Sequence, residues 1–198
     1  MKMKILLSIA LVLLIIFAVV QAYAIKSQKD IEVYPYEVFK TYDSFEIRTY
    51  ESTLFTSVKL ETSDYKKGSR QGFSILAGYI FGGNDRGETI AMTSPVTMSL
   101  EDSMTMMFMV PKSIKKEALP APNQSGITFT VEPAKKMAVV TFGGWANAAK
   151  IERYKTTLTK ALDQAGIPYT NRFYFFGYNA PYEVFNRKNE VVVELQTN

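Results

Sequence analysis

The sequence predicts one α+β domain, built from two similar ββαββ halves that close on each other around a barrel-like core. Apolar and polar residues alternate with period two in eight short segments, which is typical of half-buried strands. Two longer segments instead place their apolar residues at helical spacing. The order strand, strand, helix, strand, strand occurs twice along the chain, so each half contributes four strands and one helix.

The first half is predicted to place its strands and helix, in chain order, at residues 45–48, 54–60, 64–81, 90–100 and 104–110. The helix is expected to end at Gly82 and Gly83, because glycine accepts the left-handed conformation that terminates many helices. Its apolar face contains Phe73, Leu76 and Ile80, with Ala77 beside them. Such a stripe predicts a helix that packs on the sheet.

The second half follows a proline-containing connector at residues 111–126. Its elements are predicted, in the same order, at residues 127–132, 137–142, 146–165, 172–178 and 190–195. A short echo also links the two ends of the domain, since the sequence PYEVF occurs at residues 35–39 and again at 181–185. The repeated order and this echo together predict an internal duplication.

The N-terminus has the composition of a targeting segment. A short basic stretch precedes an apolar run over residues 5–20, and the small residues Ala22 and Ala24 follow it. This is the pattern of a secretory signal peptide with its cleavage site. We therefore predict that residues 1–24 form a signal peptide and that the mature domain covers residues 25–198.

The alternative interpretation is an uncleaved anchor. In that case residues 5–23 hold the protein on the cytoplasmic membrane, with the basic end inside. Both interpretations predict an exported domain in the periplasm or another extracytoplasmic space. The chain has no cysteine, so disulfides do not stabilise the domain there and its apolar core must hold the fold.

The absence of histidine and cysteine limits the chemistry of this chain. It excludes a Ser-His-Asp or Cys-His nucleophilic site, a zinc site of the usual kind, and haem ligation by histidine or thiolate. Removal of the two lysines of the leader reduces the 23 basic residues to 21, against 19 acidic residues. This near balance, without a basic stripe, argues against nucleic-acid binding. We predict a binding protein and not an enzyme, and we expect a monomer.

Several segments resemble the SOUL haem-binding family. They are YEVFKTYDSFEIRTY, FGGNDRGETIAMTSPVTM, FGGWA and YNAPYEVFNRKNEVVVEL, at residues 36–50, 81–98, 142–146 and 178–195. The resemblance covers residues 34–195 with its motifs in the family's order. It implies a distorted eight-stranded antiparallel barrel flanked by two helices, and non-covalent binding of haem or another tetrapyrrole.

The resemblance also implies where the ligand lies. Without a histidine, the expected mode is an apolar cleft beside the first helix of the domain, formed by Phe73, Leu76, Ala77 and Ile80. Arg70 is then available for one propionate, and Arg187 or Lys188 for the other. The competing interpretation is that the apolar residues pack in the core and the basic residues form a solvated face.

An iron ligand is not singled out, and the metal ligand stays unknown. Tyrosine and methionine both ligate iron in proteins, and Tyr178 and Tyr182 in the closing motif are the preferred candidates. The methionines around residues 98–109 suggest copper(I) instead, but Met104 and Met106 point to the opposite side of a strand from Met107 and Met109. Core packing is therefore the favoured interpretation of the methionines.

The leading hypothesis is thus a non-enzymatic, exported tetrapyrrole-binding protein. A small-molecule- or lipid-binding module on the same duplicated fold, with incidental haem binding, is the alternative. An enzyme acting on a tetrapyrrole has no positive support in the sequence.

Overall fold

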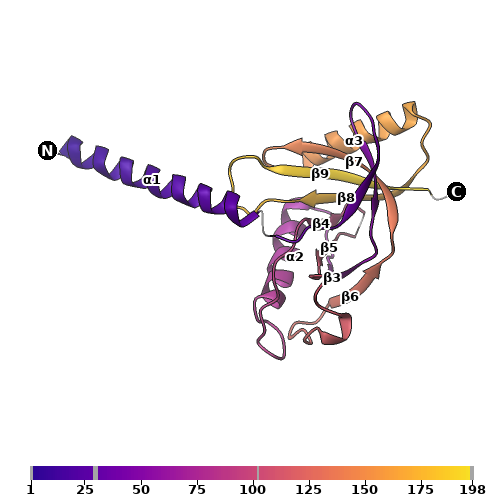
Figure 1. The fold of residues 1–198 in the computed structure, drawn as a ribbon, viewed down its shortest axis with the longest axis horizontal. Coiled ribbons are helices and arrows are strands. Elements are labelled where there is room, and N and C mark those ends of the chain that lie inside the picture. The colour runs from indigo at the N-terminus through magenta and orange to yellow at the C-terminus, as the bar shows by residue number, and fades with distance from the viewer. Residues whose placement is uncertain (1, 29–30, 102, 197–198) are drawn as a thin grey trace.

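A nine-stranded antiparallel sheet forms the centre of the protein, with two helices on one face and a long N-terminal helix projecting away from it (Figure 1). The structure is a computed structural model that describes residues 2–28, 31–101 and 103–196. The helices are α1 (Lys2–Gln28), α2 (Tyr65–Ile80) and α3 (Ala148–Gln164), with a 3-10 turn η1 (Lys116–Ala118). The strands are β1 (Tyr36–Thr41), β2 (Glu46–Tyr50), β3 (Thr53–Lys59), β4 (Val96–Ser99), β5 (Thr105–Met109), β6 (Ile127–Glu132), β7 (Lys135–Gly143), β8 (Tyr169–Gly177) and β9 (Lys188–Leu195). The predicted α+β class is confirmed.

The strand order of the sheet is symmetric. Strands pair in the order β1-β2-β7-β9-β8-β4-β5-β3-β6. When β2, β3, β4 and β5 are swapped with β6, β7, β8 and β9, respectively, the order from β2 to β6 reads the same in reverse. Strand β1 lies outside this symmetry. The two halves therefore meet at the central pair of β4 and β8. The common origin of the two halves stays a prediction.

The sheet curls but does not close into the expected eight-stranded barrel. Its edges are β1 and β6, which do not pair with each other in the described part of the chain. The additional ninth strand, β1, pairs with β2 and leaves nearly all of its side chains exposed. Because β1 buries so little surface, it extends the edge of the sheet and does not close it into a barrel.

Another difference concerns the strand predicted at residues 90–100, of which only Val96–Ser99 pairs as β4. The preceding segment makes contacts with other parts of the chain instead. The amide of Ile90 donates to Ile80 at the end of α2, and the hydroxyl of Thr93 donates to the carbonyl of Met109. Pro95 has no amide hydrogen to contribute to a ladder.

Local signals define the two helices of the domain. The side chain of Asp64 accepts a hydrogen bond from the amide of Lys67 at the start of α2, and Asn147 does the same for Lys150 at the start of α3. Gly82 follows α2 with a φ of 104°, which confirms the predicted left-handed exit. Both helices lie within two residues of the predicted boundaries.

Strand alternation divides the core between the two faces of the sheet. Residues such as Phe175 and Val191 face the helices, whereas Phe176 and Val192 lie on the inner face of the curl. The methionines follow the same rule: Met106 packs under α2, and Met107 lies on the inner face. Their alternation confirms that they fill the core from opposite sides of β5.

Two glycines of α2 offer a matched test of this packing. A Cβ atom at Gly72 would lie 2.9 Å from the Cβ of Met106 and 3.1 Å from Leu60, whereas one at Gly78 would meet nothing within 4 Å. Alanine at either position gains about 1 kcal/mol of helix propensity. Only Gly72→Ala also forces α2 away from β5, which costs about 1–3 kcal/mol.

We therefore expect Gly78→Ala to stabilise the protein and Gly72→Ala to be less stable than Gly78→Ala by about 1–3 kcal/mol. Urea unfolding of the full chain in detergent measures both values. Because the propensity gain is shared, equal stabilities of the two variants would contradict the close approach of α2 to the sheet.

Candidate functional site

The apolar stripe of α2 packs on the sheet. Leu76 is 0% exposed, and Ala77 and Ile80 are also buried in the cluster between α2 and the strands β3 to β5. These three side chains face the sheet, so the structure places them in the core. Of the predicted contacts on α2, it leaves two accessible: Phe73, which is half-buried against Phe108, and Arg70, which is exposed.

Two residues of the closing motif belong to a buried charged network around Glu190, which is 0% exposed. The hydroxyl of Tyr178 donates to Glu190 at 2.7 Å, and the Nζ atom of Lys188 lies 3.0 Å from the same carboxylate. Burial and the nearby Glu190 raise the pKa of Tyr178. Both predicted ligand contacts are therefore engaged within the protein.

Arg187 has a different environment. Its guanidinium donates to the carbonyl oxygens of Ala180 and Glu183, so neutral groups receive these hydrogen bonds. Its Nε atom is buried and has no hydrogen-bond partner among the described residues. Burial lowers the pKa of Arg187, although Glu183 partly opposes this effect. Arg187 is thus a cation held in place that retains an unused donor.

The guanidinium of Arg187 also stacks on the ring of Trp145, 3.9 Å from its centroid, and Trp145 is exposed. Tyr65, in the first turn of α2, packs edge to face on Phe175, whose ring centroid lies 6.5 Å from that of Phe142, near Trp145 in sequence. We call Tyr65, Trp145 and Arg187 the corner surface. It joins three segments that are far apart in sequence, and only Arg187 among its residues was a predicted ligand contact.

Of the two tyrosines preferred as iron ligands, Tyr178 donates to Glu190, whereas Tyr182 is exposed in the loop between β8 and β9. The carbonyl of Tyr182 accepts a hydrogen bond from the side chain of Gln21 in α1. The glycines before α3 form a turn, in which Gly144 has a φ of 72° and the carbonyl of Gly143 accepts a hydrogen bond from Lys150. Tyr182 thus offers an accessible side chain of a type that ligates haem iron in the described part of this loop.

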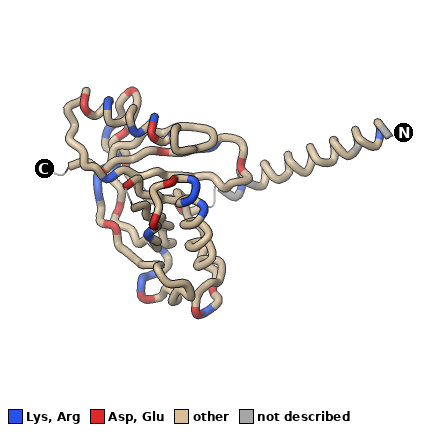
Figure 2. The backbone as a smooth tube through the Cα atoms, turned by 180° about the vertical axis from the view of Figure 1, so that it is seen from behind, with Lys and Arg blue, Asp and Glu red and all other residues tan. Residues whose placement is uncertain are grey.

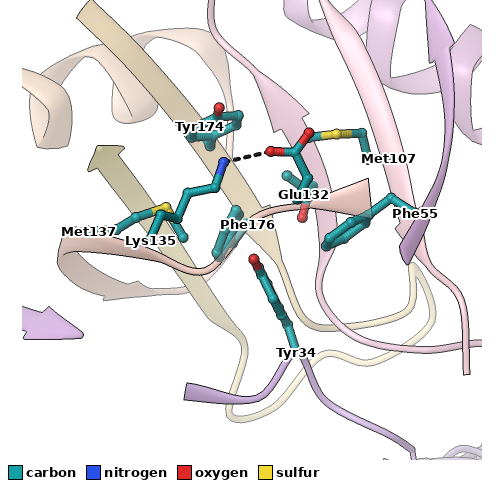
Figure 3. A pocket seen from close by; sticks show the side chains of 9 residues that line it. Tyr34, Phe55, Met107, Glu132, Lys135, Met137, Tyr174 and Phe176 are labelled. Atoms are coloured by element: carbon teal, nitrogen blue, oxygen red, sulfur yellow. Dashed lines mark hydrogen bonds and ion pairs between the residues drawn. The ribbon is translucent and has the colours of Figure 1, made fainter. Parts of the chain in front are cut away.

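A second candidate site is a pocket on the inner face of the sheet (Figure 3). It has an empty volume of about 240 Å³, including its opening to solvent. It is lined by Tyr34, Phe55, Thr97, Met107, Glu132, Lys135, Met137, Tyr174 and Phe176. The hydroxyl of Thr97 is buried and has no hydrogen-bond partner within the described ranges. Most of this volume is open to solvent, and the enclosed part holds about one water molecule, so an organic ligand requires the pocket to widen.

Charged residues close one side of this pocket. Lys135 lies 2.6 Å from both Glu132 and Glu194, and the hydroxyl of Tyr174 donates to Glu194 at 2.7 Å. Burial alone would raise the pKa of Glu194, but the hydrogen bonds from Lys135 and Tyr174 lower it. Glu194 therefore stabilises the fold above the ordinary pKa of a carboxyl group, and this contribution is lost as the pH falls through the lowered value.

The chemistry of the corner surface matches part of what a haem group requires. Aromatic rings suit the flat porphyrin, and arginine suits carboxylates such as propionates. The methionines of β5 are buried in the core, and no cluster of three acidic side chains is found among the described residues. The residues thus fit the ring and the propionates, and the exposed Tyr182 is a candidate for the iron.

Comparison with known proteins gives consistent matches. A family model described as SOUL heme-binding protein matches residues 31–194. Heme-binding protein 2 of Mus musculus is 27% identical over 84% of this chain and 82% of its own length, and heme-binding protein 2 of Homo sapiens is 29% identical over 75% and 76%. Heme-binding protein 1 of Mus musculus is 25% identical over 81% and 91%.

Solved structures show the same fold at low sequence identity. The EcmrR C-terminal domain has a TM-score of 0.61 at 12% identity and covers 82% of this chain and 99% of that chain. A hydrolase from Listeria innocua has a TM-score of 0.53 at 9% identity, with coverage of 80% and 94%. These likenesses concern the fold alone.

Proposed function

Because the chain belongs to the SOUL heme-binding protein family, we propose that it binds haem or a related tetrapyrrole non-covalently, as a binding protein and not as an enzyme. The curated relatives are named for haem binding, and their similarity extends over most of the chain. The absence of histidine and cysteine then defines the mode, since neither residue type can ligate the iron here.

We place the ligand over the corner surface and the accessible flank of α2. The observation that carries this assignment is Arg187, a half-buried cation with an unused donor beside the exposed ring of Trp145. Arg187 and Arg70 would pair with the propionates, while Trp145, Tyr65 and Phe73 would contact the porphyrin. The bound group would supply its own iron chemistry. The role of these residues is to bind and orient it.

The domain is proposed to act outside the cytoplasmic membrane. Lys2 and Lys4 precede the apolar part of α1, and basic residues at the start of an apolar helix favour the cytoplasmic side. The segment Met3–Tyr23 is long and apolar enough to cross a membrane. The sheet would then follow on the opposite side.

A haemin titration of the full chain in detergent tests the site. Trp145 is the only tryptophan of the protein, so quenching of tryptophan emission reports a ligand near the corner surface. We expect a saturable Soret change accompanied by quenching of Trp145. Arg187→Gln should raise the dissociation constant about tenfold or more, since a hydrogen bond to a charged group contributes about 1.5–3 kcal/mol.

Arg153→Gln is the matched control, because Arg153 also stacks on an aromatic ring, that of Tyr154 in α3. This variant should bind haemin as the unmodified protein does. Thermal unfolding of Arg187→Gln separates loss of affinity from loss of the loop structure. A Soret change that does not saturate would overturn the proposed function. Saturation without quenching of Trp145 would overturn only the site.

A second candidate function is binding of a small, mostly apolar molecule with one polar group in the inner-face pocket, which must widen to admit it. The aromatic lining and the unpaired hydroxyl of Thr97 favour it. Native mass spectrometry of protein purified from its own membranes distinguishes the two functions. Recovery of a non-tetrapyrrole ligand without haem would support the pocket.

A further inference from the structure

We infer that α1 remains on the protein as a membrane anchor and that the loop between β8 and β9 docks into the surface of the same bilayer. The docking residues are Tyr182, Val184 and Phe185, which we call the loop tip. All three are exposed, and Phe185 is 55% exposed. The partner of this surface is therefore a lipid bilayer, and the domain is held against it at two points.

The dimensions of α1 suit a membrane span. Its apolar segment Met3–Tyr23 contains 21 residues. At 1.5 Å per residue this segment is about 31 Å long, which matches the hydrocarbon core of about 30 Å. Figure 2 shows charged residues near the two ends of α1 and none along the segment between them.

A polar clasp joins the end of α1 to the loop. The Nε2 atom of Gln21 donates to the carbonyl of Tyr182 at 3.0 Å, and the amide of Val184 donates to the Oε1 atom of Gln21 at 3.1 Å. Gln21 is only 7% exposed. The amide nitrogen and the amide oxygen of this side chain thus both form hydrogen bonds with the loop backbone, as the backbone of a neighbouring strand would. Cleavage after Ala24 would remove this clasp, so the contact favours retention of α1.

A second contact sets the depth of the loop. The rings of Phe17 and Phe185 pack edge to face, with centroids 6.3 Å apart. Phe17 precedes Tyr23 by six residues, which corresponds to about 9 Å along the helix. If Tyr23 marks the membrane surface, Phe17 lies below it. Phe185 must then lie at the level of the lipid, because it touches Phe17.

The loop tip carries no free charge into this environment. Glu183 is buried and accepts hydrogen bonds from the side chain of Asn179 and the amide of Ala180. Arg187 is turned inward onto the carbonyls of the same loop. The exposed side chains of residues 181–186 are therefore all uncharged: Pro181, Tyr182, Val184, Phe185 and the polar Asn186. Tyrosine is typical of the interface and phenylalanine and valine of the region beneath it.

The absence of native cysteine allows a direct test. Val184→Cys and Gln164→Cys in the full chain each accept one environment-sensitive fluorophore, and Gln164 lies at the far end of α3 (Figure 1). In phosphatidylcholine–phosphatidylglycerol vesicles, we expect the label at 184 to shift to shorter wavelength, to resist iodide and to be quenched by nitroxide lipids. The label at 164 should show the opposite behaviour.

Gln21→Leu separates the clasp from the anchor, because it keeps α1 apolar while removing both hydrogen bonds. This variant should remain in the membrane while its label at 184 becomes accessible to iodide. Equal iodide quenching at 184 and 164 would overturn the inference. Protection from iodide without quenching by lipid would also overturn it, since a second copy would then cover the loop. The inference would also be overturned if the intact mass of the native protein showed that residues 1–24 had been removed.

Discussion

Glu190→Gln is expected to lower the free energy of unfolding by about 3–5 kcal/mol, the usual effect of breaking a buried ion pair by removing one partner. For a chain of this length, such a loss corresponds to a melting temperature lower by about 6–20 °C. Urea and thermal unfolding of the full chain in detergent measure both quantities.

The size of this effect follows from what Glu190 holds together. Its Oε1 atom lies 3.0 Å from the Nη1 atom of Arg48, and both side chains are almost completely buried. Tyr178 and Thr141 also donate to this carboxylate. A neutral amide would leave the buried charge of Arg48 with Glu46 as its remaining ion-pair partner, and Glu46 is partly exposed.

A double-mutant cycle isolates the pair from the rest of the network. Arg48→Gln and Glu190→Gln should each destabilise, and the double variant should be more stable than the sum of the two losses predicts. Glu51→Gln is the control, because Glu51 forms an exposed pair with Lys112 and should change stability by less than about 1 kcal/mol. Equal effects of Glu190→Gln and Glu51→Gln would show that the buried network does not stabilise the fold.

The parts of the fold that depend on local chemistry could be predicted from the sequence. Both domain helices begin beside a capping side chain, and Gly82 ends α2 in the expected conformation. The predicted strand at residues 90–100 was too long because its first part bonds to the distant Met109 and Ile80. No local pattern shows such contacts. The open edge of the sheet likewise depends on β1, whose exposed side chains give only a weak strand pattern.

In the candidate site, too, local sequence patterns predict some residues, and only the fold brings the others together. Arg187 was found from a motif, but only the strand order brings Trp145 onto its guanidinium and Tyr65 to the same corner. Gln21 lies next to the predicted cleavage motif, and its partners are 161 and 163 residues away. Helical spacing found the apolar stripe of α2, but spacing alone does not distinguish a face that packs on a sheet from one that binds a ligand.

Leu76→Ala and Phe73→Ala together separate these two roles of α2. Leu76 is completely buried among the residues between α2 and the sheet, so Leu76→Ala should cost about 2–5 kcal/mol of stability through lost burial and the cavity left behind. The folded variant should bind haemin as tightly as the unmodified protein. Phe73 is half-buried, so Phe73→Ala should cost less stability and weaken haemin binding.

Both variants are compared below their melting temperatures, by urea unfolding and by haemin titration of the full chain. An aspartate at position 76 would be a poor substitute for alanine, because an unpaired buried charge unfolds the helix whether or not a ligand binds there. If Leu76→Ala weakens haemin binding without lowering stability, the stripe is accessible in solution and the cleft beside α2 is the ligand site. If Phe73→Ala alone weakens binding, the ligand lies on the outer flank of α2, where the helix still offers an aromatic ring after its apolar stripe has packed on the sheet.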